Sequence, residues 1–426
     1  MIRITPHITN RILVRMICIM GVAFVINGRV ASAKSDLWCR HMILVYSYPT
    51  DPEAKKLSAE ELKWLAAYCD LDGKPQDFFF DGFLITGFSC GGGRHLLGAG
   101  KPAVKTDWDN AARSYTSAAV KVNDAFCLVR EALNAPNRKA KIILAIPYPD
   151  PRVTSLGSLN FSRHQDRLAM VKWFIDELSK RWNESSAAGK LDASSLVGFY
   201  WGREGASAPR TEHGTINDTK LMKDVGSYIH EKGYLFHWIP GFRSGCVFAK
   251  TPLIEVGFDC VTQQINYQNP QEPGRPLSIF DEMTEDVHKY KMHGVEMTPN
   301  VRETNLNPLI WSWQQVHLAN LEAALRLDWK KFPSMTYFDG NSFLRIASDP
   351  KTHIYYAKLH KWVKGTLTAQ DVNELCDAVI TDLTSRGVLS AERLQQINEA
   401  KTVLEKLHLM EKPITSASSS QLPRPH

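Results

Sequence analysis

The sequence predicts an α/β fold, a TIM-type (β/α)8 barrel with a small C-terminal helical appendage. Eight short runs rich in Val, Ile, Phe, Tyr and Trp recur along the chain, and helical patterns separate most of them. The runs are continuous rather than alternating, which is typical of parallel strands buried on both faces. A doubly wound open sheet would alternate in the same way, but eight units within about 300 residues favour a closed barrel.

The predicted strands, in chain order, are HMILVYSY (41–48), FFFDGFLITGF (78–88), KIILAIPY (141–148), SLVGFYWG (195–202), YLFHWIP (234–240), FDCVTQQINY (258–267), GVEM (294–297) and SMTYFDG (334–340). The clearest helical patterns cover 57–68, 107–133, 163–182, 217–233, 277–294 and 311–327. Ser58 and Glu61 are spaced as a capping box. Gly233 and Gly294 are expected to end two helices. The unit after the fifth strand leaves room for only a short helix.

The barrel is expected to span 34–365, with HIYYAKLHKWVKG (353–365) as its closing helix. Residues 366–412 are expected to form a helical appendage, in which Gly387 separates amphipathic helices. Residues 413–426 contain too few apolar side chains to fold and are expected to form a disordered tail.

Residues 1–33 have the pattern of a secretory signal peptide. Three arginines precede the apolar stretch ICIMGVAFVI, and Ala31-Ser32-Ala33 follows as a small-residue cleavage site. The chain is therefore expected to be exported to the periplasm or the extracellular space, with no stable membrane span after cleavage. A retained N-terminal anchor is the alternative, although the apolar stretch is short for a transmembrane helix.

Charge and cysteine content narrow the range of functions. The net charge of +6 falls to +2 without the four arginines of the signal, and no basic stripe stands out, so no nucleic acid partner is expected. The seven remaining cysteines are scattered and odd in number, which is not a disulfide framework. No CxxC or HxxxH pair occurs, and neither a metal nor another cofactor is expected.

In a barrel of this kind, the residues at the strand ends carry the functional signal. Here they are mainly aromatic rings, amides and carboxylates, which can stack on the CH faces of a sugar and pair with its hydroxyls. A carbohydrate is therefore the expected partner. The alternative is that many of these rings only fill the barrel. The candidate binding residues are Tyr46, Asp81, Tyr148, Tyr200, Trp201, His237, Trp238, Gln264, Asn266, Tyr267, Tyr337 and Asp339.

Glu204 follows the fourth predicted strand, and Glu296 lies in the seventh. Retaining barrel glycosidases place their acid/base and their nucleophile at the ends of these two strands, and cleavage needs two such carboxyls. Each glutamate could instead be an ion-pair partner, for instance of Arg203 or Arg302. Asp339 is the alternative second carboxylate. Asp81 lies inside a strand, where structural and substrate-binding roles stay open.

Two other motifs point elsewhere. Gly87-Phe88-Ser89-Cys90-Gly91 fits a G-x-S-x-G nucleophile elbow, but a glycine-rich loop over the barrel mouth is expected after the serine where the motif requires a helix. Gly100-Lys101 is followed by Pro102 in place of the Ser or Thr of a phosphate-binding loop, so no nucleotide is expected.

Five sequence blocks together resemble a known family. They are IPYP (146–149), GFYWGRE (198–204), HWIPGF (237–242), GFDCVTQQINY (257–267) and GVEM (294–297). In this order and spacing they resemble a family of secreted bacterial proteins known only as domain of unknown function 4855, over roughly residues 40–360. The resemblance implies a barrel of glycoside hydrolase type, with Glu204 and Glu296 at the family's matching glutamates.

This chain departs from the family pattern in two places, so its substrate is expected to differ. Thr298 stands where members tend to have a second acid, and Ile265 stands where they have the proline of a Q-P-N-Y block.

The leading expectation is therefore a secreted glycoside hydrolase that uses a two-carboxylate, retaining mechanism on a polysaccharide or oligosaccharide. Glu204 is expected to be the acid/base, with a pKa raised by its apolar neighbours. Glu296 is expected to be an ionised nucleophile that accepts hydrogen bonds from Asn266, Tyr267 and Arg302. The alternative is a non-catalytic carbohydrate-binding barrel.

Overall fold

A computed structural model describes residues 38–98, 100–205, 218–242, 253–265, 277–298 and 313–411. The predicted signal segment and the predicted C-terminal tail lie outside these residues.

The eight predicted strands are all present and form a closed parallel barrel in the order β1-β13-β12-β11-β10-β9-β8-β4. Their bounds are β1 His41–Tyr46, β4 Gly82–Thr86, β8 Lys141–Ile146, β9 Leu196–Trp201, β10 Leu235–Trp238, β11 Cys260–Gln264, β12 Gly294–Met297 and β13 Ser334–Tyr337. The barrel closes because β1 pairs with both β4 and β13. Most strands are shorter than the apolar runs from which they were predicted. The remaining residues of each run lie in the segments next to the strand.

The strand register shows which side chains share the inner face. Residues paired across parallel strands point to the same side of the sheet. Tyr46 pairs with Thr86, and Gln264 pairs with Glu296. Tyr200 pairs with His237. Following the pairings around the barrel places all of these residues on the inner face.

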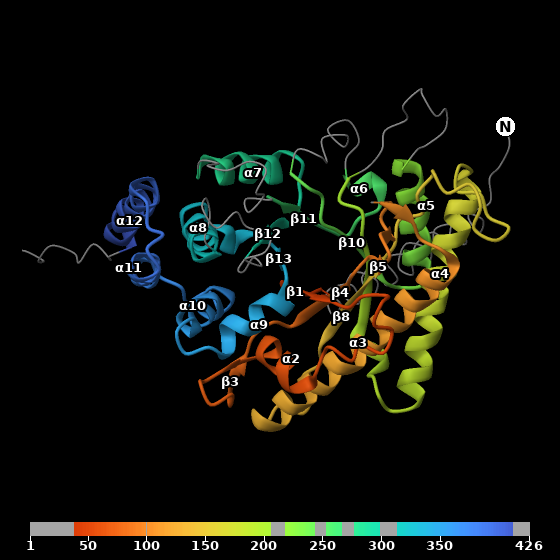
Figure 1. Ribbon diagram of the computed structural model, residues 1–426, viewed down its shortest axis with the longest axis horizontal. Coiled ribbons are helices and arrows are strands. Elements are labelled where there is room, and N and C mark those ends of the chain that lie inside the picture. Colours follow the sequence, from red (N-terminus) through yellow and green to blue (C-terminus); the bar gives the residue numbers. More distant parts are fainter. Residues whose placement is uncertain are drawn as a thin grey trace, which may run out of the picture. The chain divides into compact units, whose positions relative to one another are not determined.

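Helices surround the strands (Figure 1). Their bounds are α2 Ala59–Ala66, α3 Lys105–Ala132, α4 His164–Ala187, α5 Asp218–Glu231, α6 Leu253–Val256, α7 Ser278–Lys289, α8 Trp313–Arg326, α9 Gly340–Ser348 and α10 His353–Val363. The one-turn α6 confirms the short helix expected after the fifth strand. Helix α9 was not predicted, because it begins directly after Asp339 in a segment that reads as the end of a strand.

Local signals at the helix ends are confirmed in part. The Ser58 hydroxyl accepts a hydrogen bond of 3.2 Å from the Glu61 amide and so caps α2. Gly233 ends α5 with a φ of 81°. The expectation for Gly294 is wrong, because this glycine lies in β12 and the left-handed residue after α7 is Lys291. A Cβ at Gly294 would overlap the Ser334 carbonyl oxygen of the neighbouring strand.

Two small sheets interrupt the alternation of strand and helix. Helix α2 ends two residues earlier than predicted, and β2 Ala67–Cys69 pairs antiparallel with β3 Pro75–Phe78. The glycine-rich segment after β4 forms β5 Ser89–Gly91, β6 Arg94–His95 and β7 Lys101–Pro102. Because β5 begins at Ser89, no helix follows this serine, and the nucleophile-elbow geometry is absent from the described segment.

The C-terminal helices α11 Ala369–Ser385 and α12 Ala391–Glu411 both contact α8 (Figure 1, blue). The Gln314 side-chain amide of α8 donates a hydrogen bond of 2.8 Å to Asp382 of α11. Gly387, with a φ of 66°, separates the two helices as expected.

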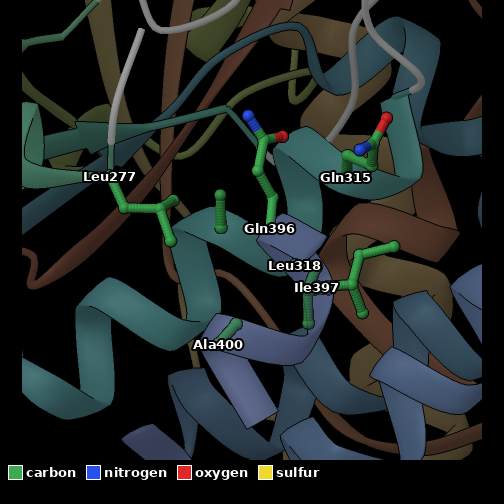
Figure 2. Close-up of a pocket in the computed structure, with 7 residues that line it drawn as sticks. Leu277, Gln315, Leu318, Gln396, Ile397 and Ala400 are labelled. Carbon is green, nitrogen blue, oxygen red and sulfur yellow. The ribbon is translucent and has the colours of Figure 1, made fainter. Parts of the chain in front are cut away.

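A cavity of about 20 Å³ remains between α8 and α12 (Figure 2). It is lined by Leu277, Gln315, Leu318, Ala319, Gln396, Ile397 and Ala400. It has room for about one water molecule and contains no titratable side chain, so it is a packing gap rather than a site of chemistry.

No helix in the described part of the chain combines the length and the apolar character needed to cross a membrane.

Candidate active site

Glu296 lies on the inner face of the barrel and Glu204 lies at its mouth. Glu296 is the third residue of β12 and is 1% exposed. Glu204 follows β9 by three residues, and its side chain is exposed to solvent. The carbonyl of Glu204 accepts a hydrogen bond of 3.1 Å from the Gly241 amide, which ties this segment to the chain after β10.

The charge of Glu204 acts on the protonation of Glu296. Burial and then the negative charge of Glu204 raise the pKa of Glu296 to about 8. Desolvation by the neighbouring protein atoms also raises the pKa of Glu204. Because the groups repel each other as anions, they titrate as a pair that retains one proton near neutral pH.

Gln264 of β11 lies close to both glutamates. Its side-chain amide favours the ionised form of each, which lowers both pKa values. Neither carboxylate oxygen of Glu296 meets the distance and angle of a hydrogen bond to another described residue. The Gln264 amide therefore offsets only part of the effect of burial on the pKa of Glu296. The backbone of Gln264 is fixed by hydrogen bonds of 2.9 Å to the Pro240 carbonyl and 2.8 Å from the Phe242 amide.

Two tyrosines complete the cluster around the pair. The pKa of Tyr46 is raised by burial and then by the charge of Glu296, and the pKa of Tyr200 is raised by burial and then by Glu204. Asn341 fixes the backbone of Tyr46, accepting a hydrogen bond of 2.7 Å from its amide and donating one of 2.9 Å to its carbonyl. Because both pKa values are raised, the two tyrosines stay protonated and can donate hydrogen bonds at the mouth.

The pKa order differs from the one expected from the sequence. The larger rise was expected at Glu204, but the more deeply buried Glu296 is the member whose pKa reaches about 8. The three donors expected to keep Glu296 ionised, Asn266, Tyr267 and Arg302, lie outside the described residues.

Arg203 does not neutralise Glu204. Its guanidinium lies over the ring of Tyr148, 4.1 Å from the centroid. The Tyr148 hydroxyl donates to the carboxylate of Asp218 at 3.1 Å, and Asp218 is ion-paired with buried Arg167 at 2.6 Å. Tyr148 is thus a buried part of a structural network rather than an open binding surface, which corrects the expectation for it.

Trp201 and Trp238 also differ from expectation. Tyr200 points into the barrel, so its neighbour Trp201 points outward and is fully buried, with its ring edge-on to Tyr148. Trp238 is 1% exposed, lies 5.2 Å from the ring of Phe258, and donates a hydrogen bond to the Arg203 carbonyl. Both indoles pack the layer between strands and helices and offer no face to a sugar.

Asp81 and Tyr337 lie away from the mouth. Asp81 directly precedes β4, at the amino ends of the strands, where burial raises its pKa and Lys141 lowers it. The Tyr337 hydroxyl reaches back to the start of β1, 2.6 Å from Nδ1 of His41, and accepts a hydrogen bond of 3.1 Å from Trp362. Neither residue can contact a ligand bound at the carboxyl ends of the strands.

Asp339 is occupied as the N-cap of α9. Its carboxylate accepts a hydrogen bond of 3.1 Å from the Ser342 amide and another from the Ser342 hydroxyl. This explains its place after β13 without a catalytic role, although its charge still influences Tyr46.

His237 faces the interior of the barrel. It is 3% exposed, and neither ring nitrogen has a hydrogen-bond partner among the described residues. Burial lowers its pKa to about 4, so the ring is neutral at physiological pH. It belongs to the inner wall beside Tyr200 and does not supply a charge to the site.

Three more half-buried aromatic residues lie at the mouth: Tyr48 after β1, Phe88 after β4 and Phe338 after β13. Tyr48 and Phe88 belong to the aromatic residues that the sequence places at strand ends. Phe338 was missed, and its place directly after the end of β13 is the signal that could have found it. Within the described ranges, no group of three His, Cys, Asp or Glu side chains is arranged to hold a metal ion.

The family model described as Domain of unknown function (DUF4855) matches residues 41–361. Among curated protein sequences, none matches this chain significantly.

Solved structures with a similar arrangement include two GH18 chitinases. The one from Pseudoalteromonas aurantia is 8% identical with a TM-score of 0.39, over 76% of this chain and 100% of the chitinase chain. The one from Flavobacterium johnsoniae is 8% identical with a TM-score of 0.37, over 75% and 94%. A mutant tryptophan synthase alpha-subunit from Pyrococcus furiosus is 13% identical with a TM-score of 0.31, over 77% and 97%.

Proposed function

This chain belongs to the family described as Domain of unknown function (DUF4855), and we propose that it is a glycoside hydrolase acting on a polysaccharide or oligosaccharide. Glu204 and Glu296 are the two catalytic carboxyl groups of the proposed reaction. The observation that carries the proposal is the raised pKa of both carboxyl groups, with the Gln264 amide beside each of them and the charge of Glu204 acting on Glu296.

The environment of the pair supports hydrolysis better than simple ion pairing. Among the described residues, no basic side chain acts on the pKa of either glutamate, as one would in an ion pair, and burial is the largest influence on both. A carboxyl that stays protonated near neutral pH can act as a general acid, and its ionised neighbour can act as a nucleophile. Two carboxyls sharing one proton thus have the composition that glycosidic bond cleavage requires.

In the proposed first step, Glu204 donates its proton to the glycosidic oxygen while the Glu296 carboxylate attacks the anomeric carbon. The bond from the anomeric carbon to the leaving oxygen breaks, and a covalent glycosyl ester forms on Glu296. In the second step, Glu204 takes a proton from a water molecule that attacks the same carbon, and Glu296 is released. The exposed position of Glu204 suits this role, because it must reach both the leaving group and water.

Substrate binding has to move the shared proton for this assignment to work. In the free protein, burial favours the proton on Glu296. Sugar hydroxyls placed over Glu296 would donate hydrogen bonds to its carboxylate and stabilise the charged form, so the proton passes to Glu204.

The test uses aryl glycosides with a good leaving group, chosen after a screen of the purified protein against a panel of polysaccharides. Glu204→Ala should still form the glycosyl-enzyme but break it down slowly, and added azide should restore turnover. Glu296→Ala should form no covalent intermediate by intact-mass measurement. Full activity in both variants would remove the pair from the mechanism, and the reverse pattern would exchange the two roles. Binding without hydrolysis of any glycan in the panel would leave a carbohydrate-binding barrel.

A further inference from the structure

Four aromatic side chains form a rim on one side of the barrel mouth: Tyr46, Tyr48, Phe88 and Phe338. They lie at or just after the ends of β13, β1 and β4, which are adjacent in the barrel. All four are half-buried, so each keeps part of its surface open to solvent. The rings of Tyr46 and Tyr48 stack with centroids 6.0 Å apart, and Phe338 meets Tyr46 edge-on at 5.9 Å.

Two glycines hold Tyr48 and Phe88 in place by leaving space for them. A Cβ at Gly202, just after β9, would overlap the tip of the Phe88 ring and lie 2.9 Å from the Ile146 carbonyl oxygen. Gly87 has a φ of 144°, and a Cβ there would overlap the Ser47 carbonyl and lie 3.2 Å from the Tyr48 ring. The rings of Phe88 and Tyr48 therefore pack directly against the backbone at the mouth of the barrel.

The rim adjoins the two glutamates. Gly202, which contacts Phe88, precedes Glu204 by two residues, and Tyr46 lies within electrostatic reach of Glu296. The carbonyl of Gly87, which precedes Phe88 in the chain, accepts a hydrogen bond of 2.6 Å from the Tyr115 hydroxyl of α3. A sugar that contacts the rim therefore also lies next to the carboxyl groups.

Three arginines near this side of the mouth already have partners. The Arg203 guanidinium lies over Tyr148, Arg152 is ion-paired with Asp150 at 2.6 Å, and Arg94 is bound to Asp107 at 2.8 Å. An anionic sugar would meet two acidic groups here, and these three arginines are already engaged by other partners. Electrostatics here favour a neutral ligand.

We propose that the aromatic rim is the binding face for a neutral glycan of flat, equatorially linked pyranoses, such as a β-1,4-linked chain of glucose type. This inference rests on the proposed function and names its substrate class. Pyranoses whose hydroxyls are all equatorial present CH groups on both faces, which stack on aromatic rings. Equatorial linkages keep successive sugar rings in one ribbon, and a ribbon can lie along a rim that spans three strands.

Binding is tested in the Glu204→Gln background, so that turnover does not remove the ligand. The probes are cellohexaose, as the neutral β-1,4-linked chain, and hexagalacturonate, as an anionic one, each titrated by calorimetry. We expect cellohexaose to bind and hexagalacturonate to bind at least tenfold more weakly. Phe88→Ala should weaken cellohexaose binding on the order of tenfold, and Phe88→Leu, which keeps apolar bulk but no flat ring, should weaken it nearly as much.

Ser89→Ala is the matched control, because Ser89 is the exposed neighbour of Phe88 and lies outside the rim. It should bind as the parent does. Gly202→Ala should reproduce the effect of Phe88→Ala by displacing the ring, and the two changes together should cost much less than the product of their separate effects. Thermal melting of each variant separates lost binding from lost folding.

Cellohexaose binding that is unchanged by Phe88→Ala, tighter binding of hexagalacturonate, or no binding of cellohexaose at all would each overturn the rim proposal. The proposed hydrolysis fails separately. Binding that depends on the rim but is not followed by hydrolysis would support the rim proposal and contradict the catalytic roles. Hydrolysis that is unchanged by Phe88→Ala would support the catalytic roles and contradict the rim proposal.

Discussion

Burial and then the charge of Glu204 raise the pKa of Glu296, so a residue exposed at the mouth of the barrel influences the protonation of one buried in its wall. Both reach this arrangement from the ends of strands that are not adjacent, β9 and β12, with β10 and β11 between them.

Removing the charge of Glu204 should make Glu296 a stronger acid. In Glu204→Gln the like-charge repulsion disappears while the burial remains, so the pKa of Glu296 should fall below its value of about 8 but stay above that of a free glutamate. Carboxyl carbon shifts measured by NMR across pH 4 to 10 report this directly. Glu60→Gln, an exposed change on α2, should leave the titration of Glu296 unaltered. An unmoved titration in Glu204→Gln would mean that the two groups are not coupled.

Activity should depend on the single proton of the pair. Once a substrate is identified, kcat/KM should fall about tenfold per pH unit above about pH 8, where the free protein loses this proton. The profile is measured from initial rates in buffers of constant ionic strength. A plateau that extends past pH 10 would contradict the need for a protonated carboxyl.

Replacing Glu296 by the isosteric amide should stabilise the fold. The folded pKa of about 8 lies above the unfolded value of about 4.3, so the folded state holds a proton that the unfolded state has released between these values. Stability therefore falls as pH rises through this window. Glu296→Gln should remove that loss and gain on the order of 1 to 4 kcal/mol at pH 8, with a smaller gain at pH 5.

Urea unfolding at the two pH values measures this difference. Glu322→Gln is the matched control, because Glu322 is equally buried but ion-paired with Arg326 at 2.6 Å. It should destabilise the protein. A destabilised Glu296→Gln at pH 8 would show that the buried carboxylate has strong partners.

Trp201 should prove to be a core residue. Its indole is fully buried against Tyr148 and Phe236, so Trp201→Ala should lower the free energy of unfolding by about 3 to 5 kcal/mol. Thermal and urea unfolding measure the change. Trp201→Phe, which keeps most of the ring volume, should lose much less. If the stability of Trp201→Ala were unchanged, Trp201 would not be a core residue and would again be a candidate for sugar binding.

We propose that the chain is exported and cleaved after Ala33. Intact-mass measurement on protein recovered from the exported fraction should show a chain that starts at Lys34. Replacing Ala31 and Ala33 by larger residues should block this processing. Finding the unaltered chain at full length in the membrane would contradict the cleavage.

The sequence was sufficient to predict the barrel, because strands buried on both faces leave apolar runs long enough to count. The same continuity concealed which side chains face inward. In LVGFYW every residue is apolar or aromatic, so no alternation distinguishes Tyr200 from Trp201, and only the pairing with neighbouring strands does so. The glutamate pair was predictable from strand position alone, but its pKa order was not, because the depth of each carboxyl depends on packing around it. Asp339 was misread since a helix cap and a catalytic acid both follow a strand.

Asn341 holds Tyr46 by both its amide and its carbonyl, across the seam where the first strand of the barrel meets the last. Until β13 and α9 have been synthesised, β1 pairs with β4 alone, and the backbone of Tyr46 lacks its two hydrogen bonds to Asn341. The aromatic rim and the wall around Glu296 therefore assemble only near the end of synthesis, and a chain cut short before Asn341 would contain both glutamates without a mouth to hold them.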